Sequence, residues 1–493
     1  MRAIIVEEYL KGATQYMYNI REQWFGNVRS DVLAGLVVAL ALIPEAIAFS
    51  ILAGVDPMVG LYASFVIAVT ISFVGGRPAM ISAATGAMAL VIVSLVKDHG
   101  LQYLLAATIL TGVIQIIFGM LKIARLMKFI PNAVMIGFVN SLAILVFIAQ
   151  TPHFIGGDIV TWAFLLATIA LIYAIPFVIK GIPAPLIAVV ILSAVAIYSG
   201  FNLKTVGDMG TITQTLPSFL IPDIPFNLET LMIILPYSLA LAVVGLVESL
   251  LTASILDDMT ASESDKNKEA RGQGIANVIN GFFGGMAGCA MIGQSVINVK
   301  SGARGRLSTF VAGVFLMFLI LVLGDYVVQI PMPVLAGVMV VVCITQFDWQ
   351  SFKYAVTAPK KDVFVMLLTI AVVLYTHNLA LGVVAGIIVS ALFFVNEISR
   401  VSISQEGKTY FVKGQLFFAS TEGFINYFKT VHSESSPIVI DFSQCKVWDD
   451  SAIGALMKVK DQLKAKNIEV TYLNIDESSK QLLRKLTGTT LID

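Results

Sequence analysis

The chain has little charge for its length. Only 13% of its 493 residues are Asp, Glu, Lys or Arg, and 57% are hydrophobic, whereas soluble globular proteins have about 25% charged residues. This shortage excludes an ordinary soluble protein. We expect a multi-pass protein of the cell membrane, in contact with lipid.

Residues of the kinds that build enzyme and metal centres are also scarce. The three cysteines are scattered, and the four histidines lie in or beside loops, with no metal-ligand or nucleophile partner at a useful spacing. We therefore expect no disulfide framework, no resident cofactor and no enzymatic activity. The basic residues form no tract that would bind nucleic acid, and the segment 1–29 has no cleavage site typical of a signal peptide.

What the sequence does have is a series of apolar runs. Nine are long enough, or nearly so, to cross about 30 Å of hydrocarbon: 32–55, 57–74, 101–120, 133–150, 159–179, 184–200, 231–256, 307–324 and 379–396. Five are shorter or broken by Gly: 84–96, 272–286, 293–303, 333–345 and 362–376. Together they predict fourteen transmembrane segments. With the N-terminus inside, nearly all loop Lys and Arg residues lie on the cytoplasmic side, and only Lys97 and Lys204 lie outside.

The predicted segments divide into two blocks of similar length. After a cytoplasmic N-terminal segment, 1–30, the blocks are 31–200 and 231–400, joined by an external linker, 201–230. Seven spans per block give the second block the opposite orientation, which is an inverted repeat of the kind common in transporters. In this repeat the first span corresponds to the eighth, and the short third segment to the short tenth.

Two of the predicted spans carry a lone acid. Glu248 lies in the run 231–256 and Glu45 in the run 32–55, and a carboxylate at such a depth costs roughly 2.5–3.5 kcal/mol unless it faces a cavity. Thr252 follows Glu248 by four residues on the same helical face, so the pair offers oxygen ligands to a sodium ion. We therefore predict cation or proton coupling through Glu248, Thr252 and Glu45. The alternative is an acid that a partner helix neutralises for packing alone.

Gly-rich stretches precede the third and tenth segments. The stretches 75–86 and 284–295 lie at membrane depth but are too rich in small residues to be helical throughout, and such backbone is tolerated only inside protein or along a cavity. If half-helices begin near Thr85 and Gln294, their N-termini form an anion site that requires no Lys or Arg. The predicted anion-binding residues are Thr85, Gly86, Gly293, Gln294 and Ser295. The alternative is close Gly-mediated helix packing.

After Arg400 the composition becomes charged and alternating, which predicts a small cytoplasmic α/β domain over 401–493. The expected strands are 401–404, 409–413, 416–419, 438–442 and 468–473, and the expected helices are 451–465 and 478–486. This domain is too short to contain a large catalytic cleft.

Several of these segments resemble the motifs of SulP anion transporters, a family that includes pendrin, prestin and cyanobacterial sodium-bicarbonate transporters. The similar segments are Ile43–Phe49, Ala53–Pro57, Gly60–Tyr62, Glu248–Leu251, Gln273–Asn277, Ser295–Asn298 and Ser301–Arg304. The tail, with Val439–Phe442 and Asp449–Ala452, resembles the STAS domain of the same family.

The resemblance implies a seven-plus-seven inverted repeat divided into core and gate domains, homodimers, and transport of inorganic or small carboxylate anions. Glu248 and Thr252 fall where the cyanobacterial members place sodium ligands, although those proteins have Asp at the position of Glu248, which leaves proton coupling open. Many relatives have Gln at the position of Glu45. Gln294 replaces a basic residue of several animal members, which favours a coupled symporter.

Our leading hypothesis is secondary active transport of bicarbonate or sulfate together with Na⁺ or H⁺. The anion lies between the half-helices, with Phe49 as an apolar wall, and alternating access moves it across the membrane. An anion exchanger or a dicarboxylate transporter of the same family is the alternative. A nucleobase permease is disfavoured by the STAS tail. A membrane sensor is the remaining hypothesis: it signals to a cytoplasmic partner through phosphorylation of Ser451, which otherwise serves as a plain helix N-cap.

Overall fold

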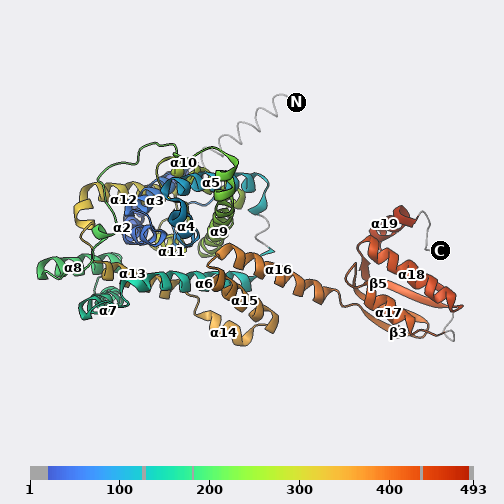
Figure 1. Ribbon diagram of the computed structural model, residues 1–493. Helices are drawn as coiled ribbons and strands as arrows, with labels where there is room; N and C mark the ends of the chain where they lie inside the picture. The colour runs from blue at the N-terminus through green and yellow to red at the C-terminus, as the bar shows by residue number, and fades with distance from the viewer. Residues whose placement is uncertain (1–19, 125–128, 180–181, 433–436, 488–493) are drawn as a thin grey trace, which may run out of the picture. The chain divides into compact units, whose positions relative to one another are not determined.

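The computed structural model describes residues 20–124, 129–179, 182–432 and 437–487. Most of the predicted cytoplasmic N-terminal segment, residues 1–19, lies outside the described residues. The chain divides into two compact units, Met1–Ile387 and Ile388–Asp493, and each is described by itself (Figure 1).

Helices make up nearly all of the first unit, and every predicted apolar run coincides with one of them. They are α2 (Val28–Ala53), α3 (Pro57–Val74), α4 (Gly86–His99), α5 (Leu101–Met120), α6 (Asn132–Gln150), α7 (Ile159–Ala174), α8 (Ala184–Ser199), α9 (Leu228–Thr260), α10 (Lys266–Phe282), α11 (Ile292–Lys300), α12 (Arg306–Val327), α13 (Met332–Gln346), α14 (Gln350–Thr357), α15 (Lys360–Thr376) and α16 (Leu379–Ile398), the last of which crosses the division between the units. Within the described residues, nine helical segments are long and apolar enough to cross a membrane. The count of fourteen spans stays a prediction, and α14 was not predicted.

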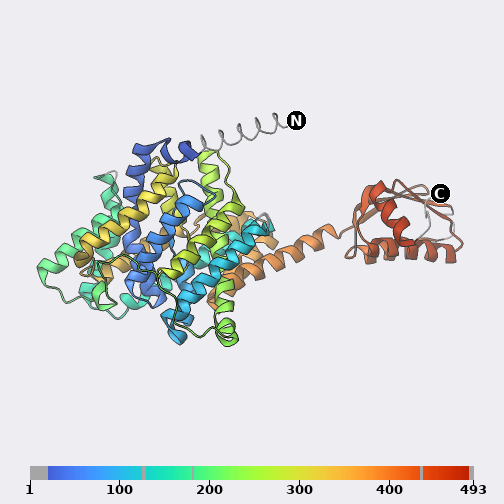
Figure 2. The same ribbon diagram turned by 90° about the horizontal axis from the view of Figure 1, so that it is seen from above.

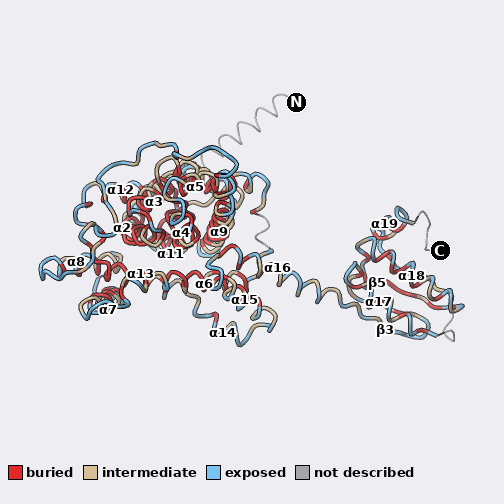
Figure 3. Tube along the Cα trace, viewed as in Figure 1, coloured by how far each residue is buried: buried red, intermediate tan, exposed pale blue. Residues whose placement is uncertain are grey.

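The helices of this unit form two groups by packing. In one group, α10 packs on α5 and α12 packs on α2 and α3. In the other, α6 packs on α13 and α15, and α7 packs on α8 and α13. We call these the core group (α2–α5 and α9–α12) and the gate group (α6–α8 and α13–α15). Figure 1 shows them as two separate layers, which overlap when seen from above (Figure 2). The core-group helices α2 and α3 are largely buried, whereas α14 is mostly exposed (Figure 3).

The two Gly-rich stretches are extended where they cross the core group. Strand β1 (Ser82–Ala84) pairs antiparallel with β2 (Gly288–Ala290), with Ala83 opposite Cys289. Asn277 of α10 holds β2 in place: its Nδ2 donates to the Gly288 carbonyl over 3.0 Å, and its Oδ1 accepts from the Gly288 N–H over 2.9 Å. The same Nδ2 donates to Gln115 Oε1 over 2.9 Å. Asn277 thus provides polar partners to backbone that no helix satisfies, and Gln115 holds the Asn277 side chain.

The second unit contains the predicted α/β domain. Its four-stranded sheet has the order β3 (Ser402–Glu406), β4 (Thr409–Leu416), β5 (Ile438–Val447) and β6 (Val470–Leu473), with β3–β4 antiparallel and the other pairs parallel. Helices α17 (Thr421–Lys429), α18 (Asp450–Ala465) and α19 (Glu477–Thr487) complete it. The core contains Phe424, Phe428, Phe442 and Tyr472.

One predicted strand in this unit is wrong. The run 416–419 contains two adjacent Phe residues, which favours a strand, but β4 ends at Leu416 and the chain turns. Ser420 Oγ accepts from the Phe417 N–H over 2.9 Å and donates to the Gln415 carbonyl over 2.9 Å, which closes the turn. Helix α17 follows and buries Phe424 and Phe428, four residues apart on one face. This helix was not predicted.

We expect Asn277→Ala to destabilise the first unit by about 3 kcal/mol, since each buried backbone group left without a partner costs roughly 1–3 kcal/mol. The thermal unfolding midpoint of the purified protein in detergent measures this loss. Asn202→Ala is the matched control, because Asn202 is exposed and such substitutions stay within about 0.5 kcal/mol. Equal midpoints for the two variants would show that the strand pair does not depend on the Asn277 side chain.

Candidate functional site

Two helix N-termini meet at the β1–β2 pair. Helix α4 begins directly after β1, with Thr85 as its N-cap, and α11 begins directly after β2, with Met291 as its N-cap. Both starts face one cavity, because Thr85 and Gly86 of one and Met291, Gly293 and Gln294 of the other line it. The first-turn amide groups of a helix carry partial positive charge. The arrangement therefore places two partially positive helix N-termini at the same cavity.

The two ends differ in how they are capped. Thr85 Oγ1 accepts from the Met88 N–H over 3.4 Å, whereas among the described residues no side chain caps the start of α11. The two glycines at these helix ends also differ in their surroundings. A Cβ on Gly86 would lie 2.9 Å from Phe49 Cε1 and 3.1 Å from Val146 Cγ2, but a Cβ on Gly293 would meet nothing within 4 Å. Gly86 is thus required for packing, and Gly293 opens onto free space.

The cavity has a volume of about 690 Å³. Its wall is mainly apolar, with Phe49, Val146 and Val341 among the lining residues. The polar lining residues come from both helix groups: Glu45, Thr85, Asn132, Glu248, Gln294, Thr345, Gln346 and Asp348. None of the described residues that line the cavity is Lys, Arg or His. The cavity is therefore acidic in composition and positive only at its helix ends.

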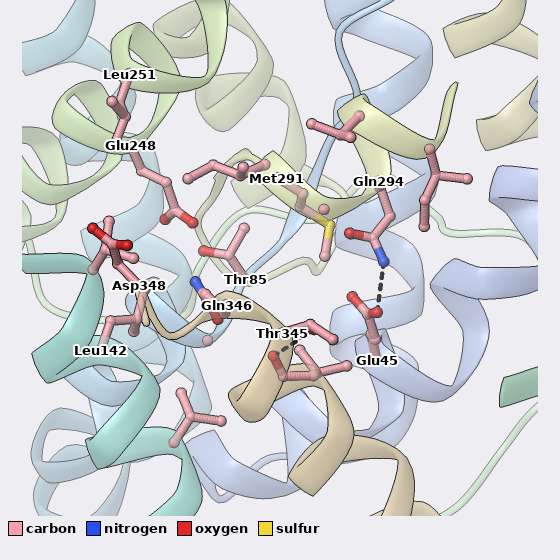
Figure 4. Close-up of a pocket in the computed structure, with 18 of the residues that line it drawn as sticks. Glu45, Thr85, Leu142, Glu248, Leu251, Met291, Gln294, Thr345, Gln346 and Asp348 are labelled. Carbon is pink, nitrogen blue, oxygen red and sulfur yellow. Dashed lines mark hydrogen bonds between the residues drawn. The ribbon is translucent and has the colours of Figure 1, made fainter. Parts of the chain in front are cut away.

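The two lone acids are buried and face this cavity from different helices. Glu45 of α2 is 7% exposed and accepts a hydrogen bond from Gln294 Nε2 over 2.5 Å. Glu248 of α9 is 4% exposed and accepts from Cys289 Sγ over 3.0 Å. Figure 4 shows Glu248 on one side of the cavity, the Glu45–Gln294 pair on the other, and Thr85 between them. Each carboxylate thus contacts a residue of the β2–α11 segment.

Most of the predicted site residues come together here. Those that line the cavity are Phe49, Thr85, Gly86, Gly293, Gln294, Glu45 and Glu248. Ser295 and Thr252 are buried outside its lining. Ser295 Oγ accepts from the Ile81 N–H over 2.9 Å, so it fixes the chain that enters β1. The Thr252 hydroxyl donates to the main-chain carbonyl of Glu248 over 2.7 Å, and its proton is therefore directed away from the carboxylate.

The sequence analysis missed several lining residues and one contact. Thr345 and Gln346 end α13, Asp348 follows it, and Asn132 begins α6. Asp348 is held at the cavity because Asn140 Oδ1 accepts from its N–H over 2.8 Å. The lone acid directly after the apolar run 333–345 was the available signal. Cys289, which contacts Glu248, had no signal beyond its place in a Gly-rich stretch.

The candidate regulatory serine lies in the second unit, near the start of α18. The N-cap of α18 is Asp449, whose Oδ1 accepts from the Ala452 N–H over 2.9 Å, so the N-cap role considered for Ser451 is wrong. Ser451 is exposed, and its N–H donates to Asp450 Oδ1 over 2.9 Å. Phosphorylation of Ser451 stays a prediction.

Comparisons with known proteins agree with this architecture. The family model described as the sulfate permease family matches residues 28–172 and 158–369, and the STAS domain model matches 400–490. The putative sulfate transporter YbaR of Bacillus subtilis (strain 168) is 56% identical over 474 residues, covering 95% of this chain and 99% of that protein. The bicarbonate transporter BicA of Picosynechococcus is 28% identical over 414 residues, covering 76% and 72%.

Solved structures give the same result for the fold. The transmembrane domain of a cyanobacterial bicarbonate transporter BicA has 27% identity and a TM-score of 0.65, covering 73% of this chain and 98% of that chain. Murine Slc26a9 in the inward-facing state has a TM-score of 0.83 over 96% of this chain and 91% of that chain, and at 18% identity it supports the fold alone. The predicted fold class, a helical membrane domain followed by a STAS domain, is confirmed.

The contrast between the two glycines gives a test of this geometry. We expect Gly86→Ala to destabilise the protein by roughly 1–3 kcal/mol, because Phe49 must shift. Gly293→Ala should cost nothing, since its methyl group enters free space and Ala favours the helix. Thermal midpoints of the two purified variants check this. Similar losses for both would contradict the packing described for Gly86.

Proposed function

This chain belongs to the sulfate permease family and carries a STAS domain, and from this premise we propose that it is a symporter, which moves a small inorganic anion together with Na⁺ or H⁺. Its relatives are named as sulfate or bicarbonate transporters, and membership of this transporter family means that the chain is not an enzyme. The chain is a multi-pass membrane protein. The choice of anion, the cation and the binding residues belong to the proposal.

The charge balance of the cavity carries this proposal. A helix N-terminus is equivalent to about half a positive charge, so α4 and α11 together supply roughly one. Glu45, Glu248 and Asp348 supply up to three negative charges when ionised, and no Lys, Arg or His among the described lining residues opposes them. The helix ends alone cannot compensate for these carboxylates. An anion therefore needs a cation or proton to enter with it.

Coupling follows from the same electrostatics. Two like unit charges roughly 8 Å apart repel by about 2 kcal/mol at an effective dielectric of 20, which is more than a tenfold change in affinity. Neutralising Glu248 with sodium or a proton removes that repulsion. By linkage, the bound anion raises the affinity for the cation by the same factor. The substrate anion and its co-ion thus load together.

The substrate contacts favour a small oxyanion. Backbone amides at the start of α11, together with Thr85 and Gln294, are neutral donors that suit either bicarbonate or sulfate. Relatives are named as sulfate and bicarbonate transporters. The cavity is lined by the core-group helices α2, α4, α9 and α11 and by the gate-group helices α6, α7, α8 and α13. We propose that these two groups move against each other to alternate access. Homodimer formation and a cytoplasmic partner for the STAS domain stay predictions.

Transport into proteoliposomes tests the proposal. We expect inward sodium or proton gradients to drive uptake of labelled bicarbonate or sulfate above the external concentration, with labelled fumarate as the dicarboxylate comparison. The gradient that drives uptake identifies the co-ion. Uptake that ignores both gradients and depends on anion loaded inside would indicate an exchanger and reject symport.

Glu248→Gln tests the residue assigned to the co-ion. We expect it to abolish gradient-driven accumulation while anion binding survives, since the amide keeps an acceptor for Cys289 but has no charge to neutralise. Glu229→Gln is the matched control, because Glu229 lies on the same helix and is exposed. Undiminished accumulation in Glu248→Gln would remove Glu248 from the coupling mechanism.

A further inference from the structure

Cys289 lies between the residues proposed for the co-ion and for the anion. It occupies the middle of β2 and is fully buried. Its Sγ donates to Glu248 Oε2 over 3.0 Å, and it lies 3.2 Å from Thr85 Oγ1. Glu248 and Thr85 both line the cavity, whereas Cys289 lies behind it. A continuous chain of hydrogen bonds thus connects α9, β2 and the start of α4.

The direction of this chain follows from counting protons. A thiol and a hydroxyl each have one proton to donate. While the thiol donates to the Glu248 carboxylate, the contact between Cys289 and Thr85 requires the Thr85 hydroxyl to donate to sulfur. One of the two lone pairs of Thr85 Oγ1 accepts from the Met88 N–H, and the other remains open to a second donor. In this arrangement the only proton of Thr85 is directed at Cys289 and is not available to an anion.

We propose that Cys289 is a positioning residue that transmits occupancy of Glu248 to the anion site. This inference rests on the proposed function. When a cation neutralises Glu248, the carboxyl group accepts less strongly, and the thiol turns to donate to Thr85 Oγ1. The Thr85 hydroxyl is then released to donate to the anion at the start of α4. The anion gains this donor only when the co-ion is bound.

A thiol suits this exchange because it is a weak donor and a weak acceptor. Neither of its two contacts is strong enough to fix one direction permanently. The hydrogen bond that Thr85 gains to the anion is stronger than the one it loses to Cys289, since a hydrogen bond to a charged acceptor is roughly twice as strong as one between neutral groups. We expect the exchange to supply roughly a tenfold increase in anion affinity, within the range found for coupled sites.

Binding of labelled sulfate and labelled bicarbonate to the purified full-length protein tests this inference. Affinity is measured with sodium or with choline, and at neutral and acidic pH. In the wild type we expect the co-ion to raise anion affinity. Cys289→Ala should bind the anion roughly tenfold more tightly without co-ion, because the Thr85 hydroxyl no longer donates to sulfur, and the increase on adding co-ion should be smaller by the same factor. Cys289→Ser should retain the increase, because a hydroxyl both donates and accepts. Cys343→Ala is the matched control, a second buried cysteine that is not among the described lining residues.

The outcomes separate the two proposals. If Cys289→Ala keeps the full increase, the relay is overturned and symport stands. If the wild type shows no increase with either co-ion, symport fails and the relay fails with it. If Cys289→Ala does not fold, the infrared S–H stretching band of the wild type tests whether the thiol changes its hydrogen-bond partner. The difference between wild type and Cys289→Ser assigns the Cys289 band, which should shift when the co-ion is added; an unchanged band overturns the relay.

Discussion

The antiparallel pair of β1 and β2 is the constraint on which the rest of the first unit depends. Extended backbone at membrane depth cannot satisfy its own polar groups, and each one left unpaired costs several kcal/mol. The two strands therefore pair with each other, and side chains such as Asn277 and Ser249 complete the set. Because each helix can begin only where its strand ends, the starts of α4 and α11 are fixed at one place inside the protein.

The same constraint divides the polar residues nearby into two kinds. Ser295, Ser249 and Asn277 bond to backbone of the strand segments, so they hold the geometry and are not free for a solute. Thr85 and Gln294 are left facing the cavity. Residues that are adjacent in sequence, such as Gln294 and Ser295, therefore have different roles. Ser295 satisfies a backbone group, whereas Gln294 faces the cavity.

Much of this was predictable because it follows from local physics. Run lengths fixed the helices, Gly content marked the non-helical stretches, and lone acids indicated a cavity. Spacing alone could not tell that Thr252 would donate its proton to the carbonyl four residues earlier, a bond that Thr often makes in helices. Cys289 and Asp348 depend on contacts between distant segments, Glu248 with β2 and Asn140 with the residues after α13. Hydrophobic periodicity in the sequence does not indicate such long-range contacts.

The distribution of the acids between the helix groups has a consequence for coupling. Glu45 and Glu248 belong to the core group and are bonded to Gln294 and Cys289 of the same group. Asp348 follows α13 of the gate group. If the groups move against each other, the two core acids keep their distance from the starts of α4 and α11, while Asp348 does not. Under the proposed function, the co-ion and the anion then remain in contact with the same rigid frame throughout the cycle, so release of either one weakens binding of the other.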